Sequence, residues 1–165
     1  MFQLVSSDTQ SPASGTVWQP ASIAGAVRSL GWRGAISGPV EFRGTSFVAV
    51  CGNGDFGAPG SGWLVGCLVP AADPLPAMQD ASLLAGYSAR AILLRQGYDV
   101  VNIQLQTALL DQGAVIEDNG QFVVLSTPGD VVHSPLQDDD GWRTDSRWCD
   151  LRRVITAAGS IGRVS

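Results

Sequence analysis

Lysine is absent from this sequence and histidine occurs once, as His133, so all ten basic residues are arginines. Much enzyme chemistry depends on a histidine that titrates near neutral pH, or on a lysine whose pKa is lowered by burial. Arginine stays protonated and can hold an anion, but it is a poor proton donor or acceptor. The composition therefore favours a binding role over catalysis.

Charge is scarce as well. Charged residues make up 15% of the chain, hydrophobic residues make up 45%, and the formal net charge is −5. A surface with so few charges exposes apolar and neutral polar groups, and contiguous apolar exposure usually marks a binding face. The negative balance disfavours a nucleic-acid backbone or an anionic membrane as partner. We therefore expect a protein partner or self-association, no nucleic acid and no membrane.

Cysteine is too sparse for a metal framework. Cys51, Cys67 and Cys149 form no C-x-x-C pair, and only one histidine could join them. No structural zinc site is expected, and no pattern predicts another cofactor. In a simple hairpin register Cys67 would face residue 46, which is not next to Cys51. Buried, reduced thiols in a reducing compartment are the expectation.

Long hydrophobic runs are also missing. The N-terminus, Met1 to Val5, lacks a basic region and a long apolar region, so no signal peptide is predicted. No apolar run approaches the ~18 residues of a membrane span. These features predict a cytoplasmic or virion location.

The patterns that are present predict one α+β domain. Residues 1–19 form a polar, turn-rich arm, and residues 20–165 form a single compact domain. The first half is rich in β-strands: a short helix over 21–30 precedes strands over 35–43, 45–51 and 63–69.

The second half is predicted to be more helical. Apolar residues at helical spacing indicate a long helix over 77–96. Residues 98–112 fit either a strand or a helix, and we favour a helix. Asn119-Gly120 predicts a β-hairpin between 114–118 and 121–126, and a final amphipathic helix covers 145–158.

A glycine-rich loop lies between the second and third strands. Its Gly52-x-Gly54-x-x-Gly57 spacing resembles a dinucleotide-binding turn, but Pro59 and two further glycines prevent the helix which that site requires. The segment from Gly54 to Pro59 resembles the nucleophile turn of chymotrypsin-like proteases, but Phe56 stands where the serine is needed. We therefore interpret the segment as a β–β loop.

Two residue groups could carry chemistry. His133, with Ser134 beside it and aspartates nearby, is the one candidate for a small hydrolase, although a relay requires groups from different elements. Asp138 and Asp140 could hold a hard cation, although Leu136 breaks the EF-hand pattern. The simpler interpretation is a structural histidine and a solvated acidic loop.

Residues 80–126 also allow a winged-helix-like nucleic-acid-binding regulator, with 102–112 as the recognition helix. That segment has no arginine to hold a phosphate backbone, so DNA affinity would be poor.

The hypothesis we favour is a non-catalytic binding or assembly protein that acts as a subunit of a larger complex, of the kind found in virions. Its contacts are predicted to come from the polar arm, the glycine-rich loop and exposed aromatic residues. The predicted interface residues are Trp18, Asp55, Phe56 and Trp142.

Overall fold

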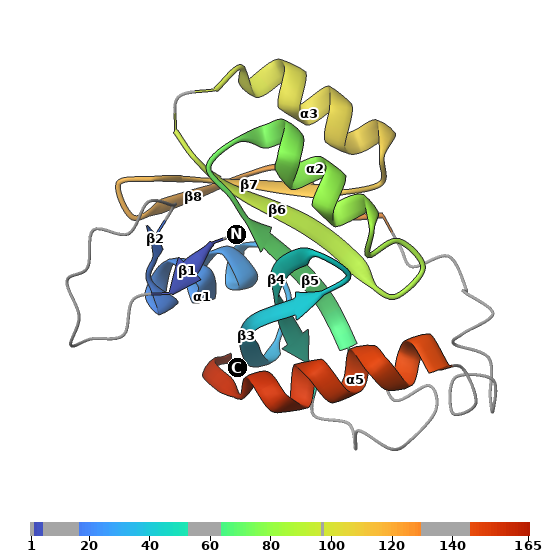
Figure 1. Cartoon of the computed structure of the whole chain (residues 1–165). Helices are drawn as coiled ribbons and strands as arrows, with labels where there is room; N and C mark the ends of the chain where they lie inside the picture. The colour runs from blue at the N-terminus through green and yellow to red at the C-terminus, as the bar shows by residue number, and fades with distance from the viewer. Residues whose placement is uncertain (1, 5–16, 53–63, 97, 130–145) are drawn as a thin grey trace.

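The computed structural model describes residues 2–4, 17–52, 64–96, 98–129 and 146–165 (Figure 1). Its centre is a mixed sheet of seven strands in the order β8-β7-β6-β5-β4-β3-β9, flanked by helices. The predicted α+β class is therefore confirmed. The strands of this sheet are β3 (Gly34–Phe42), β4 (Thr45–Cys51), β5 (Leu64–Pro70), β6 (Ala89–Arg95), β7 (Gly113–Asp118), β8 (Gln121–Ser126) and β9 (Ser160–Val164).

The first half forms as predicted. Helix α1 (Pro20–Ser29) leads into an antiparallel meander of β3, β4 and β5. The turn between β3 and β4 consists of Arg43 and Gly44, both with positive φ, which reverses the chain in two residues. Every residue of β4 is buried, as expected of a central strand.

The predicted helix over 77–96 was wrong. The chain forms helix α2 (Pro74–Ser82), turns through a segment that contains Gly86 with φ of +88°, and continues as strand β6. The run from Ala91 to Leu94 is buried on both faces of the sheet, because β6 lies parallel between β5 and β7. Periodicity does not separate such a fully buried strand from a buried helix.

The favoured helix within 98–112 is confirmed as α3 (Val100–Leu109). Asp99 is its N-cap, and its carboxylate accepts a hydrogen bond from the Asn102 amide at 3.2 Å. Helices α2 and α3 are thus the two crossovers that connect the parallel strands β5, β6 and β7. Figure 1 shows them side by side over this part of the sheet.

The C-terminal part contains both predicted elements and one that was not predicted. The hairpin of β7 and β8 turns at Asn119 and Gly120, both with positive φ, and helix α5 (Ser146–Ala158) ends before Gly159. Strand β9 then pairs antiparallel with β3 and becomes one edge of the sheet. Its sequence, Ser-Ile-Gly-Arg-Val, is too short and mixed to predict a strand.

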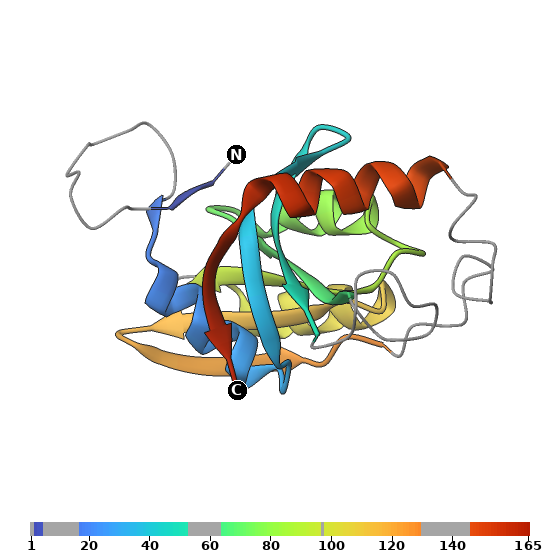
Figure 2. The ribbon, with the colours of Figure 1, turned by 90° about the horizontal axis from the view of Figure 1, so that it is seen from below.

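Both faces of the sheet are covered. Helices α2, α3 and α5 contribute Met78, Ile103 and Leu151 to one core cluster. Helix α1 contributes Ile23 and Val27 to a second cluster on the other face. Because α1 contacts β9 as well as β7 and β8, the sheet curls around it, as seen from below in Figure 2. None of the described helices is long and apolar enough to cross a membrane.

Candidate binding surface

Helix α3 is apolar on two opposite sides. Ile103 and Thr107 face the core and are buried. Val101, Leu105 and Leu109 on the solvent side are exposed to 75%, 59% and 77%, Val100 on the adjoining flank is exposed to 44%, and we call these four residues the α3 face. The apolar residues of a surface helix normally face the core, whereas those of α3 also occupy its solvent side. Its solvent side is therefore the strongest candidate for a contact surface.

The α3 face is also free of charge. Between Asp99 and Asp111 the sequence contains no charged residue. Gln106 Nε2 donates to Asn102 Oδ1 at 3.1 Å, so two of the polar side chains on this helix bind each other. The exposed valines and leucines of the α3 face belong to neither core cluster, so we expect the fold to depend little on them. Burial against another surface is the role that their chemistry suits.

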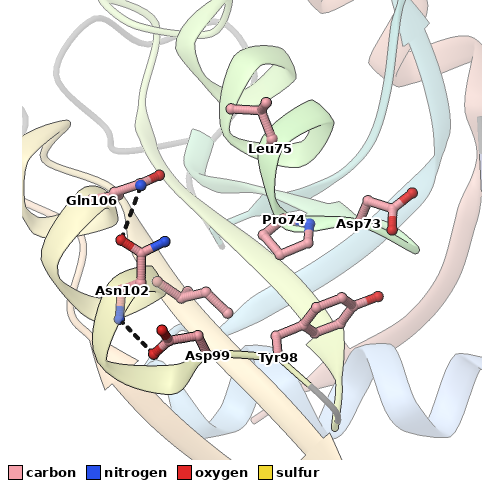
Figure 3. Close-up of a pocket in the computed structure, with 8 residues that line it drawn as sticks. Asp73, Pro74, Leu75, Tyr98, Asp99, Asn102 and Gln106 are labelled. Atoms are coloured by element: carbon pink, nitrogen blue, oxygen red, sulfur yellow. Dashed lines mark hydrogen bonds between the residues drawn. The ribbon is translucent and has the colours of Figure 1, made fainter.

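A groove runs between α2 and α3, where the parallel strands β5 and β6 end (Figure 3). Such carboxyl ends are the usual position of ligand crevices in open sheets that contain parallel strands. The groove has a volume of about 320 Å³. Its lining residues are Asp73, Pro74, Leu75, Tyr98, Asp99, Asn102, Ile103 and Gln106.

Four of the five polar side chains that line this groove are engaged in hydrogen bonds, and the Asp73 side chain makes no capping bond. Asp99 caps α3, Asn102 accepts from Gln106, and the Tyr98 hydroxyl donates to the Ala72 carbonyl. Within the described residues, the lining of the groove contains no histidine, cysteine or serine beside its carboxylates. Its arrangement therefore suits apolar contact with a partner side chain rather than proton transfer, and Leu75, which is 61% exposed, extends it toward solvent.

The buried cysteines lie together but are chemically quiet. Cys67 on β5 pairs with Ala49 rather than residue 46, and Cys51 lies two residues after Ala49 on the same face of β4, so both cysteines belong to one cluster. The predicted separation of the two cysteines was therefore wrong. Burial raises the pKa of Cys51 to about 11 and that of Cys67 to about 12, although Ser88 donates a hydrogen bond to the Cys67 sulfur at 3.2 Å. Both thiols are protonated at neutral pH and are poor nucleophiles.

Trp18 was predicted to be an exposed anchor, and this prediction was wrong. Trp18 lies in β2 (Val17–Trp18), which pairs in parallel with β1 (Gln3–Leu4), and its side chain is fully buried. The Arg95 guanidinium lies 4.3 Å from the centre of its ring, and Arg95 Nη2 donates to the Val17 carbonyl at 2.5 Å. Stacking and burial thus fix Trp18 in the cluster around α1.

The other predicted site residues fall outside the described residues. These are the interface candidates Asp55, Phe56 and Trp142, the catalytic candidate His133 and the cation candidates Asp138 and Asp140. In the part of the chain that the structure describes, no three histidine, cysteine, aspartate or glutamate residues are grouped closely enough to hold a metal ion.

The winged-helix arrangement is not what the chain forms. It required two successive helices before the hairpin, but strand β6 lies between α2 and α3. Helix α3 also packs on β7 and β8, where Thr107 Oγ1 and Ser126 Oγ are 2.7 Å apart.

Comparison of the chain with protein-family models, with curated proteins and with solved structures found no match.

The α3 face was not identified from the sequence. Its signal was the absence of charge from residue 100 to residue 110, together with leucines at positions 105 and 109, one helical turn apart.

Proposed function

We propose that this chain is a non-catalytic binding and assembly protein, and that the α3 face is the surface through which it binds a protein partner. The observation that carries the proposal is the exposure of four aliphatic side chains on one uncharged helix. Single exposed hydrophobic residues are ordinary, but a contiguous group on a rigid element is typical of an interaction site.

The chemistry of the described residues supports binding over catalysis. The cysteines in the core are protonated at neutral pH, and most polar side chains of the α2–α3 groove are engaged in hydrogen bonds within the protein. The α3 face carries no arginine, so a nucleic-acid backbone would find no positive charge there. A protein surface with aliphatic or aromatic side chains is the partner that suits this face.

Site-specific photocrosslinking tests the proposal. A photoreactive benzophenone amino acid replaces Leu105 in one full-length variant and Leu83 in another. Leu83 is a matched control because it is also apolar and 51% exposed, but it lies at the end of α2, outside the α3 face. Each variant is irradiated alone and in a lysate of its source.

We expect a discrete adduct from position 105 and a much weaker adduct from position 83. An excess of the wild-type chain, which lacks the photoreactive amino acid, should suppress the adduct from position 105. A Leu105→Glu competitor should fail to suppress it. Equal adducts from both positions, or none from position 105, would overturn the proposal.

A further inference from the structure

The sheet edge next to the α3 face has no partner strand within the described residues. Strand β8 is the last strand of the sheet on this side, outside β7, as Figure 2 shows. The ladder between β7 and β8 is regular from Gln121 to Val124 and shifts register at Leu125. Along most of its length β8 therefore presents backbone donors and acceptors in regular order.

This edge lacks the usual protection against pairing. Its sequence, Gln-Phe-Val-Val-Leu-Ser, contains no charge and no proline. Natural edge strands are commonly guarded by lysine, proline or an inward-pointing charge, because an open strand accepts another strand. By comparison, the opposite edge β9 carries Arg163. The sequence of β8 thus permits strand addition.

The α3 face and the β8 edge form one surface. The α2–α3 groove is lined by Asn102 and Gln106, so helical geometry turns the flank that contains Val100 and Gln104 away from α2, toward β8. Val123 on β8 pairs with Ile116, which belongs to the α3 side of the sheet, and Val123 is 52% exposed. The exposed apolar side chains of α3 and β8 therefore lie on the same side of the sheet.

The exposed apolar area indicates that a stable interface needs both the α3 face and the β8 edge. The exposed fractions of the α3 face and Val123 together equal about three full side chains, or on the order of 300 Å² of apolar area. A stable interface buries roughly 800 Å² on each partner. The helix face alone falls short of this area, whereas an interface that also pairs the β8 backbone covers an additional strand length of about 20 Å.

Charge favours a second copy as the occupant. Two copies that each carry a net charge of −5 repel one another over most of their surfaces. The α3 face and β8 are uncharged, so two copies can approach there without opposing carboxylates. A strand also pairs with itself about a two-fold axis when the pairing is antiparallel, and this arrangement keeps each side chain on its own face of the sheet.

We propose that the chain forms a two-fold dimer in which β8 pairs antiparallel with β8 of a second copy and the two α3 faces pack beside this junction. The sheet then continues across the axis. This inference rests on the proposed function, because it identifies the partner of the same α3 face.

Light scattering on the full chain over a range of concentrations tests the dimer. Wild type should show twice the monomer mass, and Leu105→Glu and Val123→Glu should each raise the dissociation constant at least tenfold. Leu83→Glu, equally exposed but outside the surface, should leave it unchanged. Amide hydrogen exchange provides a measurement independent of the variants: β8 amides should gain protection as the concentration of wild type rises.

The outcomes separate the two proposals. If Leu105→Glu weakens the dimer, Val123→Glu does not, and the β8 amides gain no protection with concentration, the proposed strand pairing is wrong. The α3 face then remains the interface. A monomer at every concentration overturns self-association, and crosslinking from position 105 then decides the proposed function. A dimer that neither variant weakens overturns this inference and removes the α3 face as its interface.

Discussion

At the scale of single residues, burial determines what the reactive side chains can do. Cys51 and Cys67 lie in the core, and desolvation holds their thiols in the protonated form. Trp18, an aromatic residue in a turn-rich segment, is enclosed by α1 and Arg95. Tryptophan in a polar sequence context is therefore a weak indicator of exposure, since residues distant in sequence can cover it.

The buried thiols predict a loss of stability at alkaline pH. The pKa of a cysteine is about 9 when exposed, and in the native chain it is about 11 for Cys51 and about 12 for Cys67. Between these values the unfolded chain binds fewer protons than the native chain, so the free energy of unfolding should fall as pH rises above about 9. Urea unfolding at pH 7 to 10.5 measures this slope.

Cys67→Ala provides the control for the alkaline series. Its stability at pH 7 is lower, because a buried side chain is shortened, but its decline above pH 9 should be shallower than that of wild type. Parallel slopes for the two proteins would show that Cys67 does not contribute to the pH dependence.

At the scale of elements, the start of α3 depends on one carboxylate. Asp99→Ala removes the hydrogen bond to the Asn102 amide and should lower the free energy of unfolding by about 0.5–2 kcal/mol. Asp73 occupies the same position on α2 but its side chain makes no capping bond, so Asp73→Ala should cost less than about 0.5 kcal/mol. Equal losses in urea unfolding would contradict this account of the cap.

The packing of β5 requires a glycine. A Cβ on Gly66 would lie 2.5 Å from the buried ring of Trp32, so Gly66→Ala should destabilise the fold by about 1–3 kcal/mol. A Cβ on Gly162 of β9 would meet no atom within 4 Å beyond its chain neighbours, and Gly162→Ala should be nearly neutral. Thermal unfolding compares the two, and a larger loss for Gly162→Ala would contradict the packing described.

The sequence predicted correctly those elements that are determined by neighbouring residues, such as turns and helix ends. Asn119-Gly120 adopts the positive φ values that its hairpin requires, and Gly31 and Gly159 follow the ends of their helices. Strand β6 was mistaken for a helix because its burial comes from β5 and β7 on either side, which a single sequence does not display. Strand β9 was missed because its pairing with β3 joins residues more than a hundred positions apart.

The candidate site was harder to predict than the fold. The sequence predicted a binding protein with few surface charges, but it directed attention to Trp18 and to the loops. The α3 face became visible only when Ile103 and Thr107 were found to face the core, which left Val101, Leu105 and Leu109 on the solvent side. Helical periodicity alone does not tell which of two apolar sides is covered.

At the scale of the whole molecule, the sheet is covered on both faces, and among the described residues most of the exposed large hydrophobic side chains lie on α3 and β8. The low charge of the chain becomes intelligible if this end of the sheet is buried in an assembly. Residues that serve binding alone should be replaceable without loss of the fold. This separation between folding and association is the central claim about the molecule.

The most direct test compares stability and association in one variant, Leu105→Glu, which keeps a good helix former on α3. We predict a free energy of unfolding within about 1 kcal/mol of wild type, measured at a concentration where both proteins are monomeric, together with at least a tenfold loss of association by light scattering. A variant that unfolds much more readily but associates as wild type does would contradict the claim, because Leu105 would then serve the fold and not the interface.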